Sequence, residues 1–174
     1  MADRPRTARR PFDGRRVVLG VTGGIAAYKS IQLARDLTVA GAAVDVVLTS
    51  GASEFVLPLP FEALTGRPVR TDIFAPGEAL THIRLARDAD LVAVAPATAS
   101  FMARAAAGIS DDLLGAILLA TEAPVVVAPA MNDRMFAHPQ TRVNVERLRE
   151  IGYRIAGPAV GPRAWGGGEG EGRM

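Results

Sequence analysis

The feature that most constrains the fold is an apolar run, residues 16–21 (Arg-Val-Val-Leu-Gly-Val), that ends at the turn Thr22-Gly23-Gly24-Ile25. Such a run is typical of a parallel strand that is buried on both faces. Apolar residues then recur at helical spacing from about residue 25 to residue 40, and Gly41 is placed to end this helix. Residues 43–48 are again apolar and β-branched. Together these segments predict a βαβ unit with two parallel strands.

The same alternation continues along the chain, with apolar strand-like runs and helical patterns taking turns. Strands are expected at 90–95 and 124–128, and helices near 98–107, 111–121 and 140–151. This pattern predicts an α/β fold, a Rossmann-like doubly wound parallel sheet in three α/β/α layers. Ligands of such sheets bind outside the carboxyl ends of the strands, so we expect a site at the loops 22–25, 49–53, 96–100 and 129–133.

Length and composition limit the other possibilities. A chain of 174 residues with 49% hydrophobic content can bury one core, and it has no cysteine for a disulfide or a thiolate metal site. No apolar run is long enough to cross a bilayer and no secretory signal is present, so we expect a cytoplasmic protein without a membrane role. Residues 1–15 are arginine-rich and are expected to form a flexible basic tail, with no nucleic-acid function assigned. The domain then covers 16–156, and the glycine-rich segment 157–174 is expected to form a mobile flap.

The glycine turn is suited to an anion, because backbone amides at a helix start are unpaired donors with partial positive charge. A tight turn without any ligand is the simpler alternative. A dinucleotide site would need an acidic residue after the second strand, but Leu48 is followed by Thr49 and Ser50. A P-loop would need glycine before its lysine, and Tyr28 stands there before Lys29. These features favour a mononucleotide phosphate.

Several motifs appear together in a fixed order. They are Gly20-Val-Thr-Gly-Gly-Ile-Ala-Ala-Tyr-Lys29, Thr81-His-Ile, Ala89-Asp-Leu-Val, Ala95-Pro-Ala-Thr-Ala-Ser100, Gly108-Ile-Ser-Asp-Asp-Leu-Leu114 and Pro129-Ala-Met-Asn-Asp-Arg-Met135. This set resembles the homo-oligomeric flavin-containing cysteine decarboxylases, most closely those of coenzyme A biosynthesis. The resemblance implies an FMN cofactor, the substrate 4′-phosphopantothenoylcysteine, a trimer or an assembly of trimers, and a C-terminal ligase domain in a longer polypeptide.

The resemblance also implies roles for individual residues around the flavin. The phosphate would lie at the glycine turn with two hydroxyl residues beside it, and the ring would face the loop after the third predicted strand. Phe61 would either contact the flavin of a neighbouring subunit or belong to the core. The implied cofactor-binding residues are Gly23, Gly24, Ile25, Thr49, Ser53, Phe61, Thr98, Ala99 and Ser100.

For the chemistry, the resemblance makes His82 the active-site histidine, a residue type suited to proton transfer. Asn132 would hold the substrate carboxylate with a neutral amide. Without the resemblance, His82 would be an ordinary surface or cap residue and Asn132 a helix N-cap, while His138 before Pro139 is a turn or helix-start residue. The implied substrate-binding residues are Ala130, Met131, Met135, Arg173 and Met174.

One departure from the family concerns the flap. Relatives carry Ala-Cys-Gly there, and the cysteine donates a proton when an ene-thiol intermediate is reduced, whereas this chain has Ala164-Trp165-Gly166. We therefore hypothesise that decarboxylation either finishes with another acid, such as water or Glu169, or stops at the ene-thiol. Two alternatives stay open: a peptidyl-cysteine decarboxylase of a peptide natural-product pathway, and a flavin-binding subunit without catalytic activity.

Overall fold

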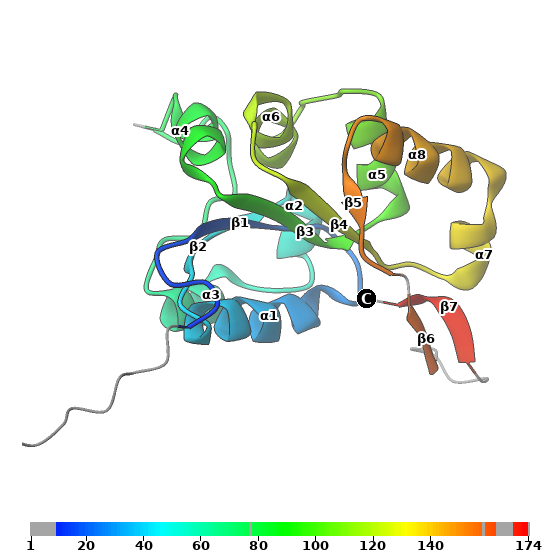
Figure 1. Ribbon diagram of the computed structural model, residues 1–174, viewed down its shortest axis with the longest axis horizontal. Helices are drawn as coiled ribbons and strands as arrows, with labels where there is room; N and C mark the ends of the chain where they lie inside the picture. Colours follow the sequence, from blue (N-terminus) through cyan, green and yellow to red (C-terminus); the bar gives the residue numbers. More distant parts are fainter. Residues whose placement is uncertain (1–9, 77, 158, 163–168, 174) are drawn as a thin grey trace, which may run out of the picture.

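The computed structural model describes residues 10–76, 78–157, 159–162 and 169–173. Its centre is a five-stranded parallel sheet with strand order β2-β1-β3-β4-β5 (Figure 1). The strands are β1 (Arg16–Val21), β2 (Ala43–Leu48), β3 (Leu91–Ala97), β4 (Val125–Pro129) and β5 (Arg154–Ile155). Since β1 lies between β2 and β3, the strand order reverses beside it, and doubly wound sheets bind their ligands at such a reversal.

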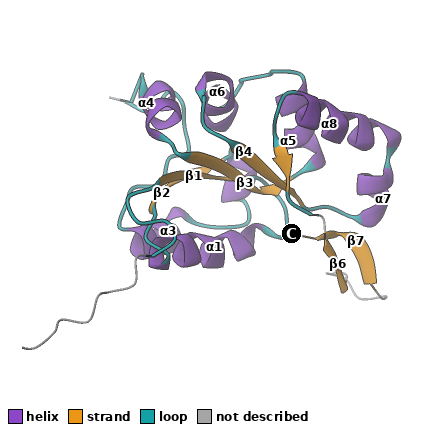
Figure 2. Cartoon of the chain, viewed as in Figure 1, coloured by secondary structure: helices purple, strands orange, loops and turns teal. Residues whose placement is uncertain are grey.

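Helices cover both faces of the sheet, which gives the three predicted layers (Figure 2). One face carries α1 (Ala27–Val39) and α3 (Pro58–Thr65), with the short α2 (Ser50–Ser53) after β2. The other face carries α4 (Thr81–Asp88), α5 (Ala99–Ala106), α6 (Leu113–Ala120) and α8 (Pro139–Glu150). Each face has its own hydrophobic cluster, so the sheet is buried on both sides, as its continuous apolar strands require.

The predicted elements correspond closely to the observed ones. Strands 16–21 and 43–48 are confirmed, and the two later strands begin one residue after their predicted starts. Among the described residues, four short helices had no predicted counterpart: α2, α3, α4 and α7 (Asp133–Ala137). Residues 10–15, assigned to the tail, form a turn in which the Phe12 amide donates to the Ala40 carbonyl at 2.9 Å. Because Phe12 also packs against the α1-side cluster, this part of the segment is held against the domain.

The glycine-rich segment contains an antiparallel hairpin outside the main sheet. Its strands are β6 (Ala159–Pro162) and β7 (Glu169–Arg173), and β7 lies beside α7 (Figure 1). The segment predicted to be a mobile flap therefore has strand structure in its described parts. Trp165, Gly166 and Met174 lie outside the described residues.

Candidate functional site

The loops that follow β1 and β2 touch backbone to backbone. A Cβ atom added at Gly23 would lie 2.6 Å from the carbonyl carbon and oxygen of Gly51, which is closer than real side chains approach. Only glycine therefore fits at position 23 while Gly51 stays where it is. The predicted loops 22–25 and 49–53 do meet at the carboxyl edge of the sheet.

The glycine turn presents unused hydrogen-bond donors. Within the described part of the chain, the amides of Gly23, Gly24 and Ile25 donate no hydrogen bond, although the Gly24 carbonyl accepts one from Ala27 at 2.9 Å. Three successive free amides just before α1 suit an anion, because a helix start carries partial positive charge. The chemistry of these donors fits the phosphate of the expected flavin.

The loop after β3 lies against the same turn. A Cβ atom at Gly24 would meet the Thr98 methyl group at 3.4 Å, an ordinary contact distance. The Thr98 hydroxyl accepts the Phe101 amide at 3.2 Å and so caps α5, whose first two residues are Ala99 and Ser100. The residues expected at the flavin phosphate and those expected at its ring are thus neighbours.

The two predicted hydroxyl residues after β2 differ in their environment. Thr49 is buried and its hydroxyl accepts the Ala52 amide at 3.3 Å, which caps α2. Ser53 is exposed, and its hydroxyl donates to the Thr49 carbonyl at 3.5 Å, the outer limit for a hydrogen bond. Both lie beside Gly51 and hence beside the turn.

Asn132 lies at the carboxyl end of β4, where it is the N-cap of α7. Its side-chain oxygen accepts the Arg134 amide at 2.8 Å, which confirms the capping role. The amide nitrogen of the same side chain donates to no group in the described residues, so it is free for a ligand. Ala130 is anchored by a 3.0 Å bond from its amide to the Ala97 carbonyl, which joins this loop to β3.

The two methionines of this segment occupy different positions. Met131 is half-buried and packs against the cluster on the α8 side, whereas Met135 is exposed on α7. The β7 strand lies beside α7, and Arg173 is its last residue. The described end of the flap is therefore next to the helix that Asn132 caps. His138 follows as the N-cap of α8, where its Nδ1 atom accepts the Gln140 amide at 3.2 Å.

His82 is the second residue of α4, on the opposite face of the sheet from α1. It is half-buried, and its Nδ1 atom is buried without a hydrogen-bond partner in the part of the chain that is described. Buried ring nitrogens are usually paired, so this unpaired atom is an exception within the described residues. No hydrogen bond of the described chain joins His82 to the glycine turn.

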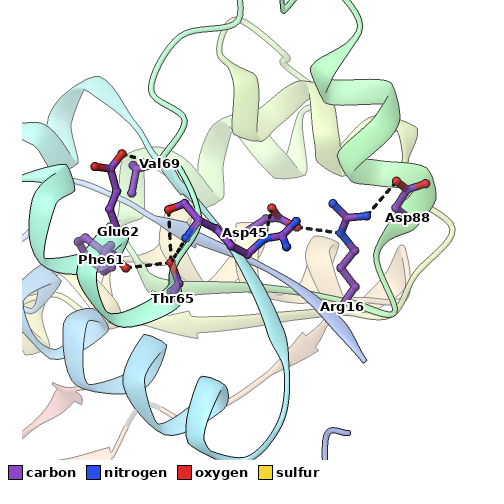
Figure 3. A network of polar contacts seen from close by, with 8 residues as sticks. Arg16, Asp45, Phe61, Glu62, Thr65, Val69 and Asp88 are labelled. Carbon is purple, nitrogen blue, oxygen red and sulfur yellow. Dashed lines mark hydrogen bonds and ion pairs between the residues drawn. The ribbon is translucent and has the colours of Figure 1, made fainter. Parts of the chain in front are cut away.

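Helix α4 is fastened at both ends. Before its start, Glu78 accepts the Thr81 hydroxyl at 2.9 Å and forms an ion pair with Arg70. At its end, Asp88 pairs with Arg16 at 3.1 Å (Figure 3). The pKa of Asp88 is lowered, mainly because the Arg87 side chain donates a hydrogen bond to its carboxylate.

Arg16 continues this network into the sheet. It also pairs at 2.9 Å with Asp45 on β2 (Figure 3). Arg67 pairs with the other oxygen of Asp45 at 2.8 Å. The hydrogen bond to Asp45 raises the pKa of Arg16 above its usual value. The position of the His82 helix is therefore tied to the first two strands.

The interpretation of Phe61 as a flavin contact needs correction. Its side chain is 0% exposed and lies in the hydrophobic cluster beneath α1 and α3. A ring buried within its own chain has no surface to offer to a flavin. Phe61 is a core residue, the second of the two possibilities raised by the sequence.

The sequence analysis missed one residue at this edge, Thr22, which it treated only as part of the turn. Thr22 is 2% exposed, and its hydroxyl bonds to Pro96 near the end of β3 and to Thr98 just after this strand. A threonine between a buried strand and two glycines was the available signal, but its partners are more than 70 residues away. Only the folded arrangement reveals them.

Two other kinds of site find no support in residues 10–76, 78–157, 159–162 and 169–173. No helix there is long and apolar enough to cross a membrane. No three histidine, aspartate or glutamate side chains come together in a way that could hold a metal ion.

The Flavoprotein family model matches residues 5–174. The chain belongs to the Flavoprotein family. Two curated relatives are coenzyme A biosynthesis bifunctional proteins, CoaBC. That of Vibrio cholerae is 48% identical over 163 residues, which are 92% of this chain and 41% of the relative. That of Mycobacterium tuberculosis is 50% identical over 160 residues, 92% and 38% of the respective chains. This chain of the Flavoprotein family thus spans about two fifths of the length of these relatives.

Solved structures support the same assignment. The FMN-dependent cysteine decarboxylase SpaF has a TM-score of 0.78 and 37% identity, covering 92% of this chain and 91% of SpaF. A cysteine-to-serine mutant of PPC decarboxylase, in complex with pantothenoylaminoethenethiol, has a TM-score of 0.79 and 30% identity, covering 92% and 90%. The sheet order and the layers of this Flavoprotein member agree with those similarities.

Proposed function

We propose that this chain is an FMN-dependent decarboxylase of the cysteine moiety of 4′-phosphopantothenoylcysteine, acting in coenzyme A biosynthesis. The observation that carries the proposal is the row of unpaired amides at Gly23, Gly24 and Ile25, which fits a flavin phosphate. The CoaBC relatives and PPC decarboxylase support the choice of substrate. A bound FMN would accept the electron pair taken from the cysteinyl side chain, which yields a thioaldehyde able to release carbon dioxide.

Asn132 would position the substrate carboxylate. Its amide oxygen is occupied by the Arg134 amide, so the side chain is fixed with its NH₂ group as the free end. A neutral donor can hold a carboxylate without strengthening its charge, so it does not oppose the loss of carbon dioxide. This arrangement supports a role in orienting the leaving group.

His82 would move the proton of the substrate thiol. An imidazole can act as base and acid near neutral pH. Within the described residues, the His82 Nδ1 atom makes no hydrogen bond that would have to break first. Because α1 and α4 lie on opposite faces of the sheet, a second copy of the chain is the simplest way for both groups to meet one flavin. Exposed apolar side chains support the expected trimer; they lie at the turn (Ile25), on α1 (Tyr28), and between α2 and α3 or on α3 (Phe55, Leu57 and Leu59).

The absence of cysteine bears on the end of the reaction. Without a thiol in the flap, reduction of the ene-thiol lacks the donor that the family resemblance implies. The PPC decarboxylase structure with a mutated cysteine holds an ene-thiol, pantothenoylaminoethenethiol, which supports release of the ene-thiol as the product here. Water or Glu169 would otherwise supply the proton.

A second candidate is oxidative decarboxylation of a peptidyl-cysteine. The absent cysteine favours it, because an enzyme that stops at the ene-thiol needs no reductive step. The likeness to SpaF and to TvaF, the latter named for thioviridamide biosynthesis, also supports it. A flavin-binding subunit without activity is the remaining alternative. The resemblance to CoaBC also supports a ligase domain in a longer polypeptide and a cytoplasmic location.

Mass spectrometry of the products separates these possibilities. The FMN-loaded protein is mixed anaerobically with phosphopantothenoylcysteine, and in parallel with a peptide ending in cysteine. Loss of carbon dioxide and two hydrogens, once per flavin, indicates the ene-thiol; loss of carbon dioxide alone over many turnovers indicates a completed reduction. Reaction of the peptide only would favour the second candidate. No carbon dioxide from either substrate would refute the decarboxylase proposal.

A further inference from the structure

The side chain of Thr22 connects two of the loops at the candidate flavin site. Its hydroxyl donates to the Pro96 carbonyl at 2.8 Å and accepts the Thr98 amide at 3.0 Å. The Thr22 amide also donates to the Pro96 carbonyl, at 3.3 Å. Because Thr22 is 2% exposed, these bonds are protected from water and the hydroxyl is not available to a ligand.

These bonds lie where the regular sheet ends. The pairing of β1 with β3 stops at Gly20 and Val94, and the register between β3 and β4 shifts after Val94. Beyond that point no strand ladder fixes the loop after β3 relative to the glycine turn. The Thr22 hydroxyl, together with the Thr22 amide, links these two segments instead. Ser30, on α1, adds a second link through its 2.6 Å bond to the Ala95 carbonyl.

The connection joins the two ends of the expected cofactor site. Gly23 and Gly24 directly follow Thr22 and present the free amides. Thr98, which is bonded to Thr22, directly precedes Ala99 and Ser100, the residues expected at the ring. A change in the Thr22 bonds would therefore alter the spacing between the phosphate amides and the ring contacts.

We infer that Thr22 is a positioning residue that fixes this spacing, so that the phosphate and the ring of one flavin are bound at the same time. The inference rests on the proposed FMN site. A site held in place before binding does not lose the freedom of two separate loops when the ligand arrives. Thr22 should thus contribute to the preference for FMN over riboflavin, which has the ring but lacks the phosphate.

The test compares Thr22→Val, which keeps the shape but removes both hydroxyl bonds, with Thr22→Ser, which keeps them. The dissociation constants of FMN and riboflavin are measured by fluorescence with the deflavinated protein. We expect the riboflavin-to-FMN ratio of dissociation constants to fall about 10-fold in Thr22→Val, the effect of losing roughly one to two hydrogen bonds. Thr22→Ser should retain the wild-type ratio.

Thr121 provides a matched control. Its hydroxyl also donates to one carbonyl, that of Ala86 at 3.0 Å, and accepts one amide, that of Ala123 at 3.1 Å, but it precedes β4 at the opposite edge of the sheet. Thr121→Val should lower the melting temperature and leave the flavin ratio unchanged. If a general loss of stability caused the fall in the riboflavin-to-FMN ratio, Thr121→Val would show the same fall as Thr22→Val.

Each outcome is decisive. An unchanged ratio in a folded Thr22→Val protein, or an equal fall in Thr121→Val, would overturn the inference. If Thr22→Val does not fold, Ser30→Ala replaces it, and the same comparison applies with a smaller expected fall. If the wild-type protein binds riboflavin and FMN with equal dissociation constants, the inference fails, although the protein still binds flavin. If it binds neither, the proposed function itself fails.

Discussion

At the scale of single residues, Asn132 has two separable tasks, since its oxygen caps α7 and its NH₂ group is free. Asn132→Asp keeps an acceptor for the Arg134 amide and places a negative charge where a carboxylate is expected. We predict a native fold and a loss of at least about 100-fold in kcat/KM for decarboxylation, since a like charge replaces a donor.

Circular dichroism and steady-state kinetics of Asn132→Asp and Asn132→Ser check this prediction. Serine keeps the cap and loses the donor without adding charge, so its loss should be smaller than that of aspartate. Equal activity in all three proteins would mean that Asn132 is only a helix cap.

Gly23 and Gly51 form a second test at this scale, because they face one another with unequal space. A Cβ at position 23 would lie 2.6 Å from the Gly51 backbone, but a Cβ at position 51 would lie 3.4 Å from the Gly23 Cα atom. We predict that Gly23→Ala lowers the free energy of unfolding by about 1–3 kcal/mol and impairs FMN binding. Gly51→Ala, the matched control, should have a much smaller effect in denaturant titrations. Equal effects would contradict the described contact between the two loops.

At the scale of elements, the Asp45 network joins β2 to β1 and, through Arg16, to the end of α4. Asp45 is 7% exposed and forms ion pairs with Arg16 and Arg67, which are both only partly exposed. Asp45→Asn leaves both cations without their shared carboxylate and should lower the free energy of unfolding by about 2–3 kcal/mol. The exposed pair of Glu146 and Arg149 is the control, because Glu146→Gln should change it by no more than about 0.5 kcal/mol. Urea titration distinguishes the two values.

Asp90 makes the stability of the β1–β3 junction depend on pH. The Arg16 amide, followed by the Arg15 side chain, lowers the pKa of Asp90. A carboxyl whose pKa is lower in the folded state stabilises the protein fully above its unfolded pKa, near ~3.9, and loses this contribution as the pH falls through the folded pKa. The difference in unfolding free energy between wild type and Asp90→Asn should therefore be constant near neutral pH and shrink below about pH 4. A difference that grows on acidification would contradict the assigned bonds.

The sequence predicted those elements whose signals are local. Buried strands such as β1 are continuous apolar runs, and Gly41 ends α1 in the expected place with a positive φ of 105°. Helix α3 was missed because Pro58 and Pro60 resemble a loop in the sequence, although proline suits the first turn of a helix. Helix α4 was missed because its N-cap residue is Leu80, whose side chain makes no capping hydrogen bond, so the sequence carries no start signal there.

At the scale of the whole molecule, the layered fold and the edge that carries the loops were predictable, because alternating strands and helices allow few topologies. The links across that edge were not. Thr22, Pro96 and Thr98 come together only after β3 is paired beside β1, and no local pattern records that pairing. Phe61 was ambiguous for the same reason, since burial depends on packing by distant segments.

The central claim is that this molecule binds FMN at the glycine turn, and the visible spectrum of the purified protein tests it most directly. We predict a flavin absorption spectrum, with a released cofactor whose mass is that of FMN, and reduced FMN retention in Gly23→Ala. A colourless protein that cannot be reconstituted with FMN would contradict the claim.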